Sequence, residues 1–149
     1  MSKNIYIASD HAGFELKEKI KKHLSMQANL EVEDLGTNSE DSVDYPDYAF
    51  EVGEKVAKDL DNLGILICGT GIGMCMAANK VRGIRAANCT FKKEAEMARK
   101  HNKANVLCLG ARIIDYNLAM DIVESFLKNG FEGERHGRRV GKIDKYRNK

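Results

Sequence analysis

The sequence lacks both a signal peptide and any apolar run of the roughly 18 residues that a membrane-spanning helix needs. It begins Met-Ser-Lys-Asn-Ile-Tyr-Ile, which leads directly into an expected strand. It also lacks a Cys-x-x-Cys pair, because its cysteines are widely spaced at positions 68, 75, 89 and 108. This spacing disfavours zinc sites and thioredoxin-type chemistry. Four thiols without a secretion signal favour the reducing cytoplasm, and we expect no membrane partner.

Neither sign of charge dominates. The chain has 24 Lys and Arg against 22 Asp and Glu, a net charge of +2, which gives no general drive toward nucleic acid. The basic segment 134–139 is short and poor in aromatic residues, so we expect no nucleic-acid partner there either. A solvated end and a phosphate clamp both remain open for it, because Arg135 and Arg139 share a face if the segment is helical.

No repeat, linker or low-complexity segment divides the chain, so residues 1–149 are expected to form one domain with a basic tail at 130–149. Strands are expected at 4–9, 30–35, 64–68, 84–89 and 105–109. Helices are expected at 13–24, 46–62, 74–80, 91–100 and 115–128, with Val52, Val56 and Leu60 on the buried stripe of the second. The alternation predicts an α/β fold, a three-layer α-β-α sandwich around a five-stranded parallel sheet. We expect a flavodoxin- or Rossmann-like sheet of order 2-1-3-4-5.

The third expected strand ends in Cys68 and passes straight into a glycine-rich turn, Cys-Gly-Thr-Gly-Ile-Gly. The glycines at 69, 71 and 73 leave backbone N–H groups able to converge on a small anion beside a helix start. The turn is no P-loop, since it lacks the Lys-Ser/Thr pair, and Met74 stands where a dinucleotide fingerprint needs a small residue. Cys68 is therefore a candidate nucleophile or base beside an anion site, with an inert buried thiol as the alternative.

In open parallel sheets, ligands bind beyond the carboxyl ends of the strands. The first strand is followed by Asp10 and His11, the third by Cys68 and Thr70, and the fifth by Arg112. We therefore expect these groups in one crevice. Simpler interpretations also exist: Asp10 could cap the helix that follows it, and His11 and Arg112 could be solvated surface groups.

Seven segments, spread in order over almost the whole chain, resemble those of the type B ribose-5-phosphate isomerases, a family that includes galactose-6-phosphate isomerase subunits. They are 8–13 (ASDHAG), 44–49 (DYPDYA), 68–73 (CGTGIG), 77–80 (AANK), 83–86 (GIRA), 99–102 (RKHN) and 133–136 (GERH). The resemblance implies reversible isomerisation of D-ribose 5-phosphate to D-ribulose 5-phosphate through a cis-enediolate, as a step of the pentose phosphate pathway. It implies no redox cofactor and no metal. Galactose 6-phosphate or allose 6-phosphate is the alternative substrate within the family.

The same resemblance implies roles for individual residues. Cys68 would be the carbon base, since Met74 replaces the glutamate that serves in one branch of the family and cannot take a proton. His101 would open the sugar ring. Asp10 would bind substrate hydroxyls and assist proton transfer between them, and Thr70 would hydrogen-bond the sulfur or the substrate.

The remaining implied residues bind substrate. Tyr45 and Asn102 would line the pocket, and His136 lies near the site without an assigned role. The backbone N–H groups of the turn would hold the enediolate oxygen; its residues are Gly69, Thr70, Gly71, Ile72 and Gly73. The phosphate would be held by His11, Arg112, Arg135 and Arg139.

His101 precedes the fifth strand, so in a parallel fold it belongs to the edge of the sheet opposite Cys68. Both groups must act on one sugar phosphate. We therefore expect a homodimer with shared active sites, which can pair further into a tetramer.

Two other classes of protein were weighed. A flavodoxin-like flavin or nucleotide binder would use the glycine turn for a phosphate and leave Cys68 incidental. A receiver-like signalling domain is disfavoured, because its phospho-acceptor aspartate would end the third strand, where Cys68 stands.

Overall fold

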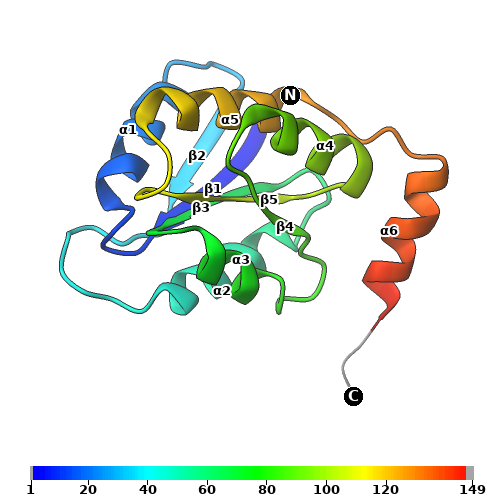
Figure 1. The fold of residues 1–149 in the computed structure, drawn as a ribbon, viewed down its shortest axis with the longest axis horizontal. Helices are drawn as coiled ribbons and strands as arrows, with labels where there is room; N and C mark the ends of the chain where they lie inside the picture. The colour runs from blue at the N-terminus through cyan, green and yellow to red at the C-terminus, as the bar shows by residue number, and fades with distance from the viewer. Residues whose placement is uncertain (1, 147–149) are drawn as a thin grey trace.

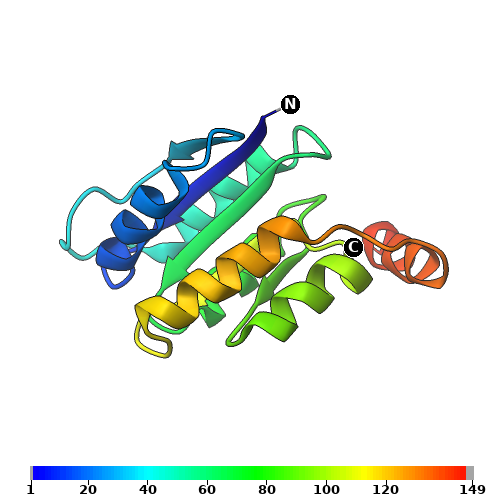
Figure 2. The ribbon, with the colours of Figure 1, turned by 90° about the horizontal axis from the view of Figure 1, so that it is seen from above.

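The computed structural model describes residues 2–146 and has three layers, with helices on both faces of one parallel sheet (Figures 1 and 2). The strands are β1 (Lys3–Ser9), β2 (Leu30–Asp34), β3 (Leu63–Cys68), β4 (Ala86–Asn88) and β5 (Val106–Gly110). The helices are α1 (Phe14–Leu24), α2 (Tyr45–Val56), α3 (Ile72–Ala78), α4 (Lys92–Asn102), α5 (Tyr116–Lys128) and α6 (Arg135–Lys145). Helices α1, α4 and α5 cover one face and α2 and α3 the other, which confirms the predicted α-β-α sandwich.

The central strands are buried on both faces, so their side chains alternate between two apolar layers. In β3, Ile65 and Ile67 face α1, α4 and α5, whereas Leu66 and Cys68 face α2 and α3. The side chain of Cys68 therefore belongs to the layer that also contains Met74 at the start of α3.

The order of the last two strands differs from the prediction. The sheet runs β2-β1-β3-β5-β4, so the expected order 2-1-3-4-5 is wrong at its end, although the fold class is confirmed. β5 is a fully buried run, Val-Leu-Cys-Leu-Gly, that pairs with strands on both sides. β4 has only three residues, all half-buried, and is flanked by Arg85. A short strand with polar neighbours tolerates an open edge, whereas the apolar β5 needs a neighbour on each side.

Helix α2 ends earlier than predicted. It stops at Val56 instead of residue 62, and Leu60, expected on the buried stripe, is 87% exposed. Local polar contacts replace the helical ones here: Asn62 Nδ2 donates to the carbonyl of Lys55 at 3.1 Å, and the amide of Asp61 donates to Asp59 Oδ1 at 2.9 Å. Asp and Asn side chains that bond nearby backbone groups commonly end helices in this way.

The basic tail forms α6, which stands away from the sandwich at the end opposite the loop that precedes α2 (Figure 1). Val140 is its buried residue, and Arg85 Nη1 ties the helix to the body by bonding Asp144 at 2.9 Å. The predicted tail also includes 147–149, which lie outside the described residues. Within residues 2–146, none of the helices has the length and apolar character needed to cross a bilayer.

Candidate active site

The carboxyl ends of β1, β3 and β5 lie next to one another. Ser9 is in register with Ile67, and Cys68 with Gly110, so the residues that follow these strands meet at one edge of the sheet. The corrected strand order puts β5 directly beside β3. Arg112 consequently reaches the glycine turn: its amide donates to the carbonyl of Gly69 at 2.9 Å, and a Cβ added at Gly69 would lie 3.0 Å from its Nη1.

Cys68 is buried at the base of this edge with only 5% of its surface exposed. The amide of Gly71 donates a hydrogen bond to its sulfur at 3.2 Å. Gly71 has a φ of 81°, a conformation that glycine adopts without cost, and this bends the chain back toward the sulfur. The turn thus places a backbone N–H group directly against the sulfur.

Thr70 closes the turn. Its Oγ1 accepts a hydrogen bond from the amide of Ile72 at 3.2 Å, which leaves the hydroxyl proton available to a ligand. The side chain of Asn88, at the end of β4, supports the same turn by donating to the carbonyl of Thr70 at 3.4 Å. Asn88 was not among the predicted site residues, although a polar side chain near the end of an expected strand is the feature that marks the other residues of this edge.

Asp10 and His11 lie at the end of β1. Asp10 is buried, and its Oδ1 accepts from the amide of Gly13 at 3.1 Å, so it does close the turn that leads into α1. His11 Nδ1 accepts from the amide of Val43 at 3.2 Å. With Nδ1 as an acceptor, the neutral ring carries its proton on Nε2, where it can be donated to an anion.

Tyr45 begins α2 and lies across the glycine turn. A Cβ added at Gly73 would come within 2.5 Å of two carbons of the Tyr45 ring. The ring can therefore lie in this position only because residue 73 is a glycine. The structure thus brings together, at one edge, ten of the predicted residues: Asp10, His11, Tyr45, Cys68, Gly69, Thr70, Gly71, Ile72, Gly73 and Arg112.

His101, Asn102, Arg135 and Arg139 are not at this edge. α4 ends at Asn102, near the amino ends of the strands, where Val106 is in register with Gly64. From Val106 to Gly110, the partner of Cys68, β5 advances about 13 Å at roughly 3.3 Å per residue. Figure 1 shows α6 and the end of α4 at this far side of the molecule. One chain therefore holds the two halves of the predicted site apart.

At the far edge, the rings of His101 and His136 stack with centroids 4.2 Å apart and an 11° angle between their planes. Partial burial, followed by the positive charge of His101, Arg135 and Arg139, lowers the pKa of His136 below its usual value. Glu132 Oε1 lies 3.7 Å from His101 Nε2. Asn102 lines a neighbouring groove of about 770 Å³ together with Arg85 and Tyr146.

The thiols of the other cysteines differ in pKa. The pKa of Cys75 is lowered to about 7, chiefly by its hydrogen bond with Cys108, whereas burial raises that of Cys89 to about 12. Within residues 2–146, no three or more His, Cys, Asp or Glu side chains are grouped to hold a metal ion.

The family model described as Ribose/Galactose Isomerase matches residues 5–143. The chain belongs to the ribose/galactose isomerase family. Ribose-5-phosphate isomerase B of Escherichia coli is 45% identical to it over 141 residues, covering 95% of this chain and 94% of that protein. The family's enzymes are aldose–ketose isomerases, and the prediction that this chain is one of them is confirmed.

Solved structures of family members agree with the fold. Ribose-5-phosphate isomerase B from Mycoplasma genitalium, determined with bound ribulose-5-phosphate, superposes with a TM-score of 0.94 at 53% identity, covering 98% of this chain and 97% of that one. A ribose 5-phosphate isomerase from Thermotoga maritima superposes with a TM-score of 0.93 at 53% identity, covering 98% and 100%.

Proposed function

We propose that this family member interconverts D-ribose 5-phosphate and D-ribulose 5-phosphate. The observation that supports this best is the buried Cys68 thiol, with the amide of Gly71 donating to its sulfur, at the edge where Arg112 and Tyr45 also converge. The M. genitalium relative was solved with the ketose product of this reaction bound. We expect the enzyme to work in the cytoplasm, where thiols stay reduced.

The proposed chemistry is a proton transfer between neighbouring carbons. The Cys68 thiolate removes the proton from C2 of the open-chain aldose, and the electron pair moves to form a cis-enediolate. The backbone N–H groups of the turn, with the hydroxyl of Thr70, stabilise the charge that develops on the C1 oxygen. The Cys68 thiol then returns the proton to C1, while the proton of the C2 hydroxyl passes to the C1 oxygen with the help of Asp10, which leaves a carbonyl at C2 and a hydroxyl at C1. Asp10 binds the neighbouring hydroxyls with its second carboxylate oxygen, because the first accepts from the Gly13 amide.

We propose further that two chains share each site. Ring opening needs an acid–base group such as His101, which in the same chain lies at the opposite edge of the sheet, and β5 alone advances about 13 Å between the two edges. A two-fold axis would bring His101 and Asn102 of one chain to Cys68 of the other. The free edge of β4 and the protruding α6, on which Ile143 is 57% exposed, offer unpartnered surface for such contact. Such dimers can pair into tetramers.

In this dimer the phosphate would be bound from both chains. His11 and Arg112 lie at the edge with Cys68, and Arg135 and Arg139 would reach across on α6. Guanidinium groups suit phosphate because each can donate two parallel hydrogen bonds.

The family description names galactose as well as ribose, so six-carbon sugar phosphates are the competing substrates. The purified chain should be assayed on ribose 5-phosphate, galactose 6-phosphate and allose 6-phosphate under the same conditions. We expect kcat/KM to be highest for ribose 5-phosphate. A higher value for either hexose phosphate would reassign the substrate, and inactivity on all three would refute the proposal.

A further inference from the structure

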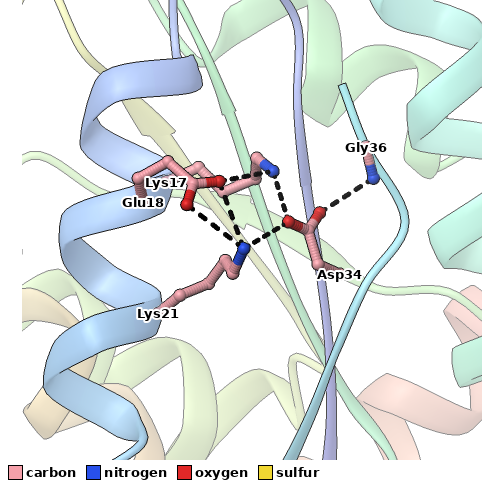
Figure 3. Close-up of polar contacts among 5 residues, drawn as sticks. All are labelled: Lys17, Glu18, Lys21, Asp34 and Gly36. Atoms are coloured by element: carbon pink, nitrogen blue, oxygen red, sulfur yellow. Dashed lines mark hydrogen bonds and ion pairs between the residues drawn. The ribbon is translucent and has the colours of Figure 1, made fainter. Parts of the chain in front are cut away.

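The structure contains a lysine with no exposed side-chain surface, Lys17 on α1 (Figure 3). Its ammonium group lies 2.6 Å from Asp34 Oδ2 and 3.3 Å from Glu18 Oε1. Lys21, one turn further along α1, contacts the same Asp34 Oδ2 at 2.6 Å. Removing these charges from water is costly, and ion pairs of this kind are often no more stable than apolar replacements. Stability alone therefore does not account for the cluster.

The second carboxylate oxygen of Asp34 has a different partner. Asp34 Oδ1 accepts a hydrogen bond from the backbone amide of Gly36 at 2.8 Å (Figure 3). Burial raises the pKa of Asp34, but Lys17, Lys21 and the Gly36 amide outweigh it, so the net pKa lies below its usual value. The lysines thus keep Asp34 charged, and the charged group holds Gly36.

Gly36 is the first residue of the loop 36–44, which connects β2 to α2. Its carbonyl accepts from the amide of Ser9 at 2.8 Å, and the amide of Thr37 donates to the carbonyl of Ser9 at 2.9 Å. The loop is therefore attached to the residue that immediately precedes Asp10 and His11. Its backbone at Gly36 has a φ of 105°, with the Tyr48 ring packed against it.

The far end of the loop reaches the site itself. The amide of Val43 donates to His11 Nδ1 at 3.2 Å, and Tyr45 follows two residues later with its ring over Gly73. Both the orientation of His11 and the starting point of Tyr45 thus depend on where the loop lies.

We propose that Asp34 is a positioning residue for the sugar-phosphate site, acting through loop 36–44 on His11 and Tyr45. Lys17 and Lys21 support this role, because they keep the Asp34 carboxylate ionised and fixed in place. The role depends on the oxygen that accepts from the Gly36 amide, which an apolar side chain cannot supply. The expected kinetic effects of this inference rest on the proposed function. The attachment of loop 36–44 to Asp34 can be measured without any activity assay.

Two double variants isolate that oxygen. Lys17→Met/Asp34→Asn and Lys17→Met/Asp34→Leu both remove the buried ammonium and the carboxylate, and Asn and Leu are similar in size. Only Asn retains a carbonyl oxygen for the Gly36 amide. We expect the Asn variant to keep KM within about twofold of wild type and the Leu variant to raise KM roughly tenfold, with kcat changed less because Cys68 is untouched.

Amide hydrogen exchange provides the second measurement. The Val43 and Thr37 amides should exchange faster in the Leu variant than in the Asn variant, while amides of the central strands exchange alike in both. Equal KM values and equal loop exchange in the two variants would overturn the proposal.

A further pair of variants tests the link if the Leu variant does not fold. Val43→Pro removes the N–H that reaches His11, whereas Val43→Ala keeps it, and neither alters the buried cluster. KM should rise for Val43→Pro alone; unchanged KM in both would overturn the role of the loop. Wild-type protein that isomerises no sugar phosphate would refute the proposed function instead, and the exchange comparison would still decide whether Asp34 anchors the loop.

Discussion

Each glycine of the turn after β3 leaves room for a different side chain. Gly69 accommodates the guanidinium of Arg112, Gly71 the amide of Asn88, and Gly73 the ring of Tyr45. The turn therefore does more than free backbone N–H groups for an anion. It allows residues from three other parts of the chain to approach Cys68, and substitutions at Gly69 and Gly73, where a Cβ meets side-chain atoms, should change binding before they change folding.

The first prediction concerns the sulfur. Cys68→Ala removes the proposed carbon base, so kcat should fall by a factor on the order of 10² to 10⁴ while the protein stays folded. Steady-state kinetics with circular dichroism would measure both. Cys89→Ala is the matched control, because burial raises the pKa of that thiol to about 12 and its side chain packs in the opposite apolar layer. Near-normal kcat in Cys68→Ala would mean that the thiol is structural.

A second prediction concerns Gly73. In Gly73→Ala the new methyl group would lie 2.5 Å from the Tyr45 ring, so the ring must move. Overpacking of this kind costs about 1–3 kcal/mol, and we expect KM to rise roughly tenfold. Gly130→Ala, which meets no atom within 4 Å, is the control and should behave as wild type. Unchanged KM in Gly73→Ala would show that Tyr45 does not contact substrate.

At the scale of elements, α1 and β2 are joined by the cluster around Asp34. Helix α6 is joined to the sandwich through Val140, the Arg85–Asp144 pair and the stack of His136 on His101. The first connection includes the fully buried side chain of Lys17. The second leaves most of a basic helix exposed. Loss of a charged side chain should therefore lower the stability of the fold at the α1–β2 connection, whereas on α6 it should change KM and not the melting temperature.

The pH dependence of stability tests the α1–β2 connection. The pKa of Asp34 is lower in the folded protein than its usual value, so its contribution is present above about pH 4 and is lost as pH falls through the folded value. Asp34→Asn removes the nearer of the two carboxylates that contact the buried Lys17 ammonium and should cost about 3 kcal/mol at pH 7. Urea unfolding should show this difference shrinking toward pH 3.

The exposed pair of Glu15 and Lys19 on α1 is the control for that measurement. Its side chains are 73% and 53% exposed, so Glu15→Gln should change stability little at any pH. A constant difference between wild type and Asp34→Asn from pH 3 to pH 7 would contradict the ionised carboxylate.

For α6, we expect Arg135→Ala and Arg139→Ala to raise KM for sugar phosphates without lowering the melting temperature. A charge-assisted phosphate contact is worth roughly 1.5–3 kcal/mol, which corresponds to a change in KM of about 10- to 150-fold. Lys145→Ala, on a different face of the same helix, is the control. If all three variants kept the wild-type KM, the helix would be a solvated end.

The fold places the two groups that act on one sugar in the proposed mechanism at opposite edges of the sheet. Cys68 ends β3, and His101 lies at the end of α4, near the amino ends of the strands. This is a property of parallel α/β topology, because each helix returns the chain to the amino edge. The proposed mechanism therefore requires a second copy of the chain.

Mixing two inactive variants tests the shared site. Cys68→Ala and His101→Ala chains, allowed to exchange subunits, should recover about a quarter of wild-type activity. This follows because half of randomly formed dimers are mixed and each has one intact site. Sedimentation would verify that mixed dimers form. Verified heterodimers without activity, or a fully active monomer, would exclude the shared arrangement.

The sequence by itself determined the fold class, the family and one half of the site. Strand and helix patterns are local, and so is the Cys-Gly-Thr-Gly turn, whose torsion at Gly71 depends on neighbouring residues. Because parallel strands align their carboxyl ends, the positions of Asp10, Cys68 and Arg112 along the chain were enough to predict that they meet.

Only the tertiary structure decided the order of β4 and β5 and the contacts that support the site. A crossover can place the next strand beside its predecessor or one position beyond, and the choice depends on which strand fills the sheet interior best. The bonds from Lys17 to Asp34 and from Val43 to His11 join residues 17 and 32 positions apart. The periodicity of a strand or helix cannot predict contacts over such separations in sequence. These contacts form only when the sheet, its helices and their connecting loops pack together.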